Sequence, residues 1–482
     1  MTLPDYDSSY YNSYDALGLA GLVESGEVSP AELLEEAIIR TEYVNGELNA
    51  VTATYYEQAR KAAQSRLPQG PFRGVPFLIK DAEVLMKDHV TTTGSASWEG
   101  DVADHDSTLV QRYKNAGVVI FGRTNCPELA LKPVTEPEAY GPTRNPWNLE
   151  RTPGGSSGGA AAAVAAGIVP VAHATDGGGS IRMPSSCCGL VGLKPSRGRI
   201  PHGPDHMESW GGQSTGHVIS RSVRDSAAML DATAGADVGD SYAAPEIRGT
   251  FLDAVYRSPG QLKIAISREK WGPGDYSPEV LEGLEKTISL LEDMGHIVEE
   301  ARPDINGELA SAAGFTVISV SAALALKQRA RQLGCEVDAL PMEAGTRSLL
   351  EFGRSISSLD YAEAIQTNHG LARSIGQFMQ RYDLILAPTM ATPPVPIGYL
   401  NAESDSEYTR RLVGFMGDTT FFNQTGQPSI SLPLYWTDDG LPVGMMFSAA
   451  YGREDVLLSL AGQLEQAVPW KDKKPSVYAG KK

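Results

Sequence analysis

Apolar and polar positions along the first part of the chain predict two helices followed by a short buried strand. The run Ser-Pro-Ala-Glu at residues 29–32 places a capping serine, a first-turn proline and a glutamate ahead of apolar positions at helical spacing. A second amphipathic helix is predicted over residues 50–65. Residues 74–81, Gly-Val-Pro-Phe-Leu-Ile-Lys-Asp, form an apolar run that stops at a lysine. This pattern predicts a buried strand with Lys80 at its end.

The pattern then continues as an alternation of helices and strands. Helical spacing covers residues 106–117 and 277–295, and short apolar runs typical of strands occupy residues 118–122, 296–299 and 382–388. Such alternation is typical of layered α/β folds. No internal repeat and no low-complexity linker divides the chain, so we predict one domain with insertions.

Composition narrows the class of protein. The chain has 482 residues, 41% of them hydrophobic and 21% charged, with a formal net charge of -18. Nucleic-acid-binding proteins usually carry a basic surface, which this composition does not favour. The N-terminal sequence shows no basic leader with an apolar segment, and no stretch approaches the about 18 to 20 uninterrupted apolar residues of a membrane span. The four cysteines show no disulfide framework. We therefore expect a soluble cytoplasmic protein without a nucleic-acid or membrane partner.

Residues 152–198 carry the candidate chemistry. Two glycine-serine clusters, Gly154–Gly159 and Gly177–Ser180, bracket an alanine-rich helix and a short strand. Ser180 follows three glycines, and successive N–H groups in such a turn can converge into an oxyanion hole. A serine nucleophile needs a base, and no histidine lies in a suitable setting. Lys80 is the available candidate, because serine-lysine variants of the catalytic triad exist.

A lysine can serve as a base only if its pKa is lowered. An ordinary lysine pKa of about 10.4 leaves under about 1% of the amine neutral at pH 8. Burial at a strand end can lower that pKa by a few units. The hypothesis therefore predicts a desolvated Lys80 that is neutral in the resting enzyme.

Other interpretations of the glycine clusters account for fewer of these features. A phosphate-binding P-loop requires a lysine that residues 154–161 do not supply. The formal match of residues 154–158 to a nucleophile elbow lacks a preceding strand and recognisable acid and histidine partners. Glycine turns that only permit tight helix–sheet packing remain an open alternative. His202 and His206 lie in a segment rich in proline and glycine without a set of acidic or cysteine partners, so we expect no metal site there.

Several ordered motifs resemble those of the amidase signature family over nearly the whole chain. They are the runs at residues 74–81, 122–128, 154–159, 176–184, 189–195, 423–429 and 441–444. The resemblance implies a Ser–cis-Ser–Lys triad with Lys80 as base, Ser156 as the relay after a cis peptide bond and Ser180 as nucleophile. Ser157 is the second candidate for the relay. No cofactor and no metal is implied.

The resemblance also implies a mechanism by acyl transfer. Lys80 draws the proton of Ser180 through the relay serine, and backbone N–H groups of Gly177, Gly178, Gly179 and Ser180 hold the oxyanion. Gly177 stands where the family often has a larger residue, which predicts a looser loop. We expect Asp176 and Arg182 of this motif to form an ion pair that supports the loop and takes no part in the chemistry.

The fold implied by the resemblance is an α/β three-layer α/β/α sandwich around a large mixed β-sheet. It predicts a single amidase domain over residues 1–482, with an N-terminal helical arm at about 1–65, the signature core at about 70–210 and a substrate-pocket helical region at about 300–425. A small-molecule amide is the expected substrate. A monomer or homodimer is the expected assembly.

Within that family, residues 135–149 and 450–455 look most like the hydrolases of aminohexanoate cyclic dimer. This likeness implies activity on linear or cyclic amides, with an apolar pocket lined by residues 311–330 and 415–422 that favours medium-chain or aromatic substrates. Alternatives with the same triad are carbamate, anilide or ester hydrolysis, or a role as the amide-cleaving component of a glutamine-dependent tRNA amidotransferase. A non-catalytic binding protein on an amidase scaffold is disfavoured by the intact serines and lysine.

Overall fold

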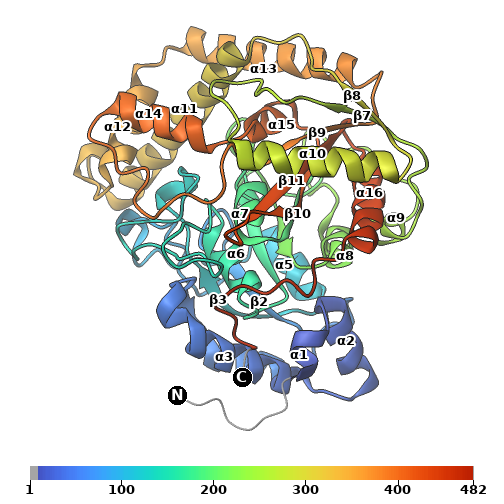
Figure 1. Cartoon of the computed structure of the whole chain (residues 1–482). Coiled ribbons are helices and arrows are strands. Elements are labelled where there is room, and N and C mark those ends of the chain that lie inside the picture. Colours follow the sequence, from blue (N-terminus) through green and yellow to red (C-terminus); the bar gives the residue numbers. More distant parts are fainter. Residues whose placement is uncertain (1–8, 481–482) are drawn as a thin grey trace.

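One eleven-stranded mixed sheet organises the molecule (Figure 1). A computed structural model of the chain describes residues 9–480, so residues 1–8 and 481–482 of the predicted domain and arm lie outside the described residues. The strand order is β1-β3-β2-β4-β6-β5-β10-β11-β9-β7-β8. The strands are β1 (Val51–Thr54), β2 (Pro76–Lys80), β3 (Val119–Thr124), β4 (Val171–Asp176), β5 (Val191–Lys194), β6 (Thr215–Ser220), β7 (Lys263–Ile266), β8 (Ile297–Glu300), β9 (Leu384–Pro388), β10 (Ser429–Trp436) and β11 (Pro442–Ala449).

Helices cover both faces of this sheet and one end of it. The α-helices are α1 (Ser9–Ser13), α2 (Ala16–Ser25), α3 (Pro30–Leu48), α4 (Tyr56–Gln64), α5 (Thr108–Asn115), α6 (Gly158–Ala165), α7 (Arg182–Cys188), α8 (Val223–Thr233), α9 (Phe251–Val255), α10 (Pro278–Asp293), α11 (Gly307–Leu333), α12 (Ala344–Ser355), α13 (Ser358–Phe378), α14 (Asp405–Phe415), α15 (Thr419–Thr425) and α16 (Glu454–Ala467). Short 3-10 helices lie at Ala96–Trp98, Glu128–Ala130 and Val337–Ala339.

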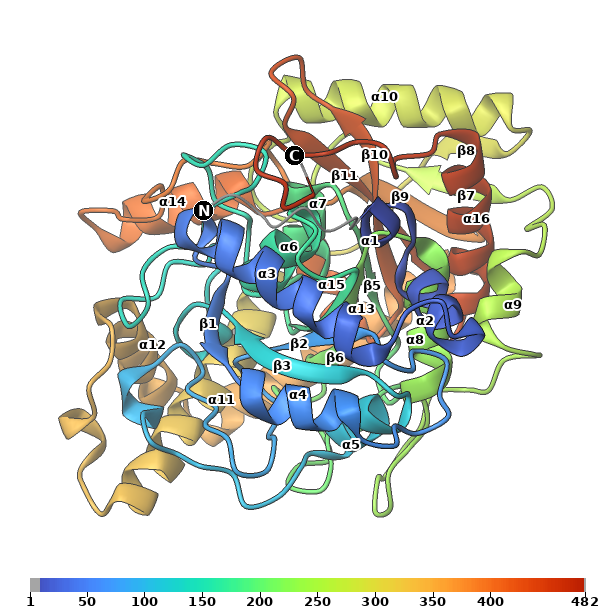
Figure 2. The same ribbon diagram turned by 90° about the horizontal axis from the view of Figure 1, so that it is seen from below.

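Strand β11 shows how the layers are built, because successive residues of a strand point to opposite faces of a sheet. A Cβ added to Gly444 would meet Ser186 of α7, whereas the side chain of the next residue, Met445, packs against Gly283 of α10. The N-terminal helices α3 and α4 pack on β2 and β3, at the end of the sheet seen from below in Figure 2. The predicted three-layer α/β/α sandwich around a mixed sheet is therefore confirmed.

The three strands that carry the candidate chemistry are neighbours and run parallel. β2 pairs with β3 on one side and with β4 on the other. Lys80 is the last residue of β2 and lies opposite Thr124, and β4 ends at Asp176. Because the carboxyl ends of parallel strands meet at one edge of a sheet, the loops that follow β2 and β4 converge beside Lys80.

Local predictions near the N-terminus are confirmed in one case and wrong in another. Helix α3 begins at Pro30 with Ser29 as N-cap, and the predicted capping box with Glu32 is present. The predicted helix over residues 50–65 is wrong in its first part, since residues 51–54 form strand β1 and the helix begins at Tyr56. The β-branched residues of Val-Thr-Ala-Thr suit a strand, and antiparallel pairing with β3 supplies its partner.

Helices α12 and α13 both pack on α11, in the upper part of Figure 1, and α11 also contacts α15. By length and composition alone, α11 is apolar enough to cross a membrane, with a mean hydropathy of 1.9 over a window of which 39% is buried. Serine, threonine and glycine interrupt its apolar residues, so α11 contains no long uninterrupted apolar run of the kind that predicts a membrane span from sequence.

Candidate active site

Lys80 is buried at the end of β2 and its amine is held by two hydroxyl groups. None of its surface is exposed. Lys80 Nζ donates to Ser156 Oγ at 2.7 Å and to Thr175 Oγ1 at 2.8 Å. The backbone N–H of Lys80 donates to His173 Nδ1 at 3.2 Å. The lysine predicted as base is thus in direct contact with one of the two candidate relay serines.

The structure distinguishes the two candidate relay residues. Ser156 contacts Lys80, and the peptide bond between Gly155 and Ser156 is cis. Ser157 points elsewhere: its Oγ donates to the backbone carbonyl of Thr175 at 3.2 Å and accepts from the N–H of the same residue at 3.3 Å. Ser157 therefore holds the loop against β4, and Ser156 is the serine in contact with the lysine amine.

Ser180 lies in the turn between β4 and α7, and 8% of its surface is exposed compared with 1% for Ser156. Within residues 9–480, its hydroxyl makes no hydrogen bond to Ser156, so the second contact of the predicted relay is not formed in this structure. Catalytic hydrogen bonds are often long in free enzymes and tighten when substrate binds. The nucleophilic role of Ser180 stays a prediction.

A buried ion pair holds the turn between β4 and α7. Asp176 accepts hydrogen bonds from Arg182 Nη2 at 2.9 Å and from Arg182 Nε at 2.9 Å, and both residues are fully buried. The same carboxylate accepts from the N–H groups of Gly179 at 2.7 Å and Ile181 at 3.1 Å. Asn423 Nδ2 donates to it at 2.8 Å. The predicted ion pair is therefore present, and its carboxylate binds the backbone N–H groups on both sides of Ser180, the candidate nucleophile.

This geometry refines the predicted oxyanion hole. The N–H of Gly179 is already bonded to Asp176, so this glycine cannot also donate to an oxyanion without breaking that bond. Its φ of +129° lies in a region that favours glycine, and an added Cβ would collide with Thr419 Oγ1. Gly179 thus shapes the turn, while the N–H groups of Gly177, Gly178 and Ser180 remain the predicted donors.

Close packing also explains the absence of a side chain at Gly177. A Cβ built there would lie 2.5 Å from Trp210 Cε3, so the indole occupies the space that a larger residue would need. On the other side of the turn, Thr419 and Thr420 both donate to the carbonyl of Gly178, at 2.7 and 3.2 Å. The loop is therefore packed from two sides, and the looser turn expected from its three glycines is not what the structure holds.

Burial dominates the electrostatics around the lysine. It lowers the pKa of Lys80, while the negative charges of Glu83 and Asp176 raise it to a smaller extent. The direction agrees with the predicted desolvated amine. Burial by itself would raise the pKa of Asp176, but the charge and hydrogen bonds of Arg182 outweigh it, and the pKa of that carboxyl is held well below its usual range.

Two further titratable residues lie near the lysine. His173 is fully buried and hydrogen-bonded, and burial lowers its pKa well below the ordinary value, so the ring is neutral. Cys126 is fully buried and burial raises the pKa of its thiol, which keeps it protonated and unreactive. Among residues 9–480 no group of three or more histidine, cysteine, aspartate or glutamate side chains could hold a metal ion.

Sequence reasoning missed three residues of this site. Thr175, the second partner of the lysine, could have been found, since strand alternation puts it on the same face as His173. Asn423 belongs to one of the ordered motifs, but nothing in that motif indicates that its amide spans Asp176 and Gln213. Trp210 lies in a loop, and no local signal connects it with the glycine turn.

Comparisons with known proteins extend over nearly the whole chain. A family model described as Amidase matches residues 32–458. The chain is 37% identical over 478 residues to the 6-aminohexanoate-cyclic-dimer hydrolase of Paenarthrobacter ureafaciens, with 96% of each protein covered. A solved structure of 6-aminohexanoate cyclic dimer hydrolase has a TM-score of 0.91 at 35% identity, with 97% of this chain and 99% of that chain covered. A bacterial aryl acylamidase of the amidase signature enzymes has a TM-score of 0.87 at 28% identity, with the same coverage of 97% and 99%.

These matches confirm the resemblance that the ordered motifs predicted. The matched residues 32–458 include every strand from β1 to β11 and all of the loops that surround Lys80. The chain belongs to the amidase family and is an amide-hydrolysing enzyme.

Proposed function

We propose that this enzyme hydrolyses carboxylic amides through a Ser–cis-Ser–Lys triad made of Lys80, Ser156 and Ser180. One observation carries the proposal: a fully buried lysine amine donates to Ser156 at 2.7 Å, at the edge of the sheet where the turn with Ser180 also lies. A desolvated amine is a competent base near neutral pH. A lysine that only served packing would not need two hydroxyl partners beside a glycine-rich turn.

The proposed reaction proceeds in two balanced steps. In the first, Ser180 Oγ bonds to the amide carbon while its proton passes to Ser156, whose own proton passes to neutral Lys80. The carbon–nitrogen bond then breaks, and the proton returns through Ser156 to the departing amine, which leaves an acyl-enzyme. In the second step a water molecule repeats the sequence and releases the carboxylic acid. Backbone N–H groups of Gly177, Gly178 and Ser180 stabilise the oxyanion in both steps.

The substrate class proposed is a linear or cyclic amide with an apolar body. The likeness to cyclic-dimer hydrolases and to an aryl acylamidase supports this class. The turn with Ser180 is packed against α15, and α15 in turn contacts the apolar helix α11. Such helices offer hydrocarbon surface to a substrate body, which favours neutral acyl or amine groups over charged ones.

A comparison of serine variants tests the triad. Ser180→Ala and Lys80→Met should each lower kcat by about 10³-fold or more, because residues of a triad act as a unit. Ser156→Ala should lose far more activity than its neighbour variant Ser157→Ala, since only Ser156 contacts the lysine. A fluorophosphonate probe should label the wild type and Ser157→Ala but not Ser180→Ala. Labelling that survives Ser180→Ala would overturn the assignment of the nucleophile.

A substrate panel tests the substrate class. It should contain 6-aminohexanoate cyclic dimer, a linear aliphatic amide, an anilide, a carbamate, an ester and glutamine, each followed by release of amine, alcohol or ammonia. The proposal expects the highest kcat/KM on one of the neutral amides or the anilide. A preference for the carbamate or ester would support the alternative hydrolases. Ammonia release from glutamine as the dominant activity would support the amidotransferase alternative and contradict this proposal.

A further inference from the structure

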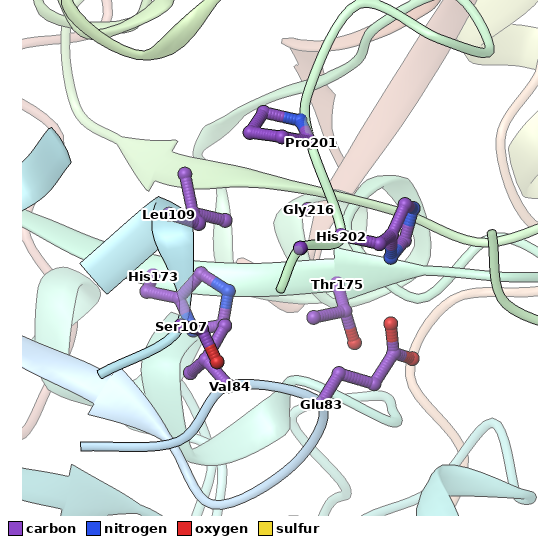
Figure 3. Close-up of a pocket in the computed structure, with 10 residues that line it drawn as sticks. Glu83, Val84, Ser107, Leu109, His173, Thr175, Pro201, His202 and Gly216 are labelled. Atoms are coloured by element: carbon purple, nitrogen blue, oxygen red, sulfur yellow. The ribbon is translucent and has the colours of Figure 1, made fainter. Parts of the chain in front are cut away.

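A small pocket lies on the surface beside Lys80, lined by residues that the proposed reaction does not use (Figure 3). Its volume is about 10 Å³, close to the about 10–15 Å³ that a cavity needs to hold one water molecule. The polar residues around it are Glu83, Ser107, His173, Thr175 and His202, and Gly216 is one of its glycines.

Two of these lining residues contact the lysine directly. Thr175 Oγ1 accepts a hydrogen bond from Lys80 Nζ at 2.8 Å, and it keeps its own proton to donate to another acceptor. His173 Nδ1 accepts from the backbone N–H of Lys80 at 3.2 Å. The floor of the pocket is therefore one hydroxyl group away from the amine of the proposed base.

The other ring nitrogen of the histidine has no hydrogen-bond partner in the part of the chain that the structure describes. His173 is fully buried, and its Nε2 makes no hydrogen bond among residues 9–480. A Cβ added to Gly216, another lining residue, would lie 3.6 Å from this nitrogen, so Nε2 faces the pocket. Buried polar atoms in proteins are nearly always hydrogen-bonded to protein or to ordered water. An unpaired nitrogen in a water-sized cavity is the signature of a bound water molecule.

The outer wall of the pocket supplies a carboxylate. Glu83 is exposed, and Ser214 Oγ donates to its two carboxylate oxygens at 3.0 and 2.9 Å. In Figure 3 the Glu83 carboxylate and the Thr175 hydroxyl both project into the same space, with the imidazole of His202 beside them. His202 Nε2 is hydrogen-bonded to the carbonyl of Ser214 at 3.2 Å, which anchors this wall.

A buried amine exchanges protons only through its neighbours, and Lys80 has two. Ser156 leads toward Ser180, which a bound substrate or acyl group covers during turnover. We propose that a water molecule bound between Thr175, His173 and Glu83 forms a second proton path, through which Lys80 exchanges protons with solvent while the substrate side is closed. A protonated Lys80 passes a proton to Thr175, which passes its own proton to the water and on to the carboxylate or solvent. The path rests on the proposed role of Lys80 as base.

Several charged or titratable groups face Lys80 and set its proton affinity together. Burial lowers the pKa of the amine, and negative charge on neighbouring side chains raises it. Asp176 is neutralised by its bond to a buried arginine, whereas Glu83 is paired with no cation among the described residues. The groups that face Lys80 from β3, β4 and the following loops are Glu83, Arg123, Cys126, His173 and Asp176.

The test compares pH–rate profiles of Glu83→Gln and the wild type, using a neutral amide substrate. Loss of this negative charge should lower the pKa of Lys80 and move the acid limb of kcat/KM to lower pH by a few tenths to about one unit. Glu24→Gln on the exposed face of α2 is the matched control, since it changes net charge equally and should leave the limb in place. An unshifted limb in Glu83→Gln would overturn the proposal.

A second variant and a crystal structure test the water itself. Gly216→Ala places a methyl group beside His173 Nε2, where the only close contact is the end of the flexible Leu109 side chain, so it fills the cavity without reshaping the backbone. It should move the acid limb in the same direction, because the amine loses its hydrating water. High-resolution density should show a water bonded to His173 Nε2 in the wild type and none in Gly216→Ala. A dry wild-type cavity would refute the path even if Ser180→Ala is inactive, whereas activity retained in Ser180→Ala would refute the triad instead.

Discussion

Replacing Asp176 with asparagine tests whether the buried ion pair is a scaffold or part of the chemistry. The carboxylate accepts hydrogen bonds from the side chains of Arg182 and Asn423 and from two backbone N–H groups, those of Gly179 and Ile181. The shortest bond to each of these four residues measures between 2.7 and 3.1 Å. Asp176→Asn keeps one carbonyl oxygen, turns an NH2 group toward other donors and leaves the guanidinium buried without a counter-charge. Breaking such a buried pair costs about 3–5 kcal/mol.

That cost is large beside the whole stability of a domain, which is about 5–15 kcal/mol. We therefore expect Asp176→Asn to lose about 3–5 kcal/mol of unfolding free energy and most of its activity together. Urea denaturation followed by fluorescence, alongside kcat, measures both. The exposed variant Asp438→Asn is a control that should stay within about 0.5 kcal/mol of the wild type. The double variant Asp176→Asn/Arg182→Leu should regain part of the stability, because it removes the uncompensated charge.

The difference in unfolding free energy between the wild type and Asp176→Asn should depend on pH with a definite sign. The pKa of Asp176 in the folded protein lies well below its usual range, so its stabilisation is complete above the unfolded value of about 3.9. It is lost as pH falls through the folded pKa. The gap between wild type and Asp176→Asn should thus be constant from about pH 5 to 8 and narrow below about pH 4. A variant that unfolds at the wild-type urea concentration yet is inactive would refute the scaffolding role.

Three further outcomes follow from packing and exposure. Gly177→Val should lower kcat by about 10–100-fold, because the valine side chain would collide with the indole of Trp210. Adding Trp210→Ala to this variant should restore part of the lost activity, and strictly additive losses in the double variant would contradict the contact. Gly353→Ala should lower the free energy of unfolding by about 1–3 kcal/mol, since the added Cβ would collide with the backbone carbonyl of Ser319. A variant with the urea midpoint of the wild type would disprove this prediction. Of the four cysteines Cys335 is exposed and the others are buried, so a thiol reagent should titrate about one group in the native enzyme and none rapidly in Cys335→Ser.

The parts of the fold that sequence predicted were those with local signals. The start of α3 was predictable because residues 29–32 contain the sequence motif of a capping box. The end of β2 was predictable because an apolar run stops at Lys80. Residues 51–54 were predicted wrongly, because their strand conformation depends on pairing with β3, a strand distant in the sequence that no local pattern reveals.

The residues of the candidate site could be proposed from the sequence, but the contacts between them could not. Glycine clusters and a strand-ending lysine pointed to Lys80 and Ser180, yet the contact between Lys80 and Ser156 spans 76 residues and depends on β2 and β4 being neighbours in the sheet. Sequence could not show that Gly179 uses its N–H in an internal bond. Nor could it show that Trp210 occupies the space of a missing side chain, since that contact crosses between separate loops.

The carboxylates near Lys80 differ in what they contact and therefore in what their charges do. Asp176 is fully buried and bonded to an arginine at 2.9 Å, so its charge holds the turn rigid and acts only weakly on the amine. Asp81 likewise lies 3.8 Å from a buried arginine. Glu83 is exposed and faces no cation among the described residues, so its charge is free to raise the proton affinity of the amine through the pocket. The remaining surface charges of an enzyme with net charge -18 are screened by salt beyond about 8–10 Å. Burial and the two carboxylates Glu83 and Asp176 therefore set the proton affinity of Lys80, while the ion pair of Asp176 with Arg182 also holds the turn that carries Ser180.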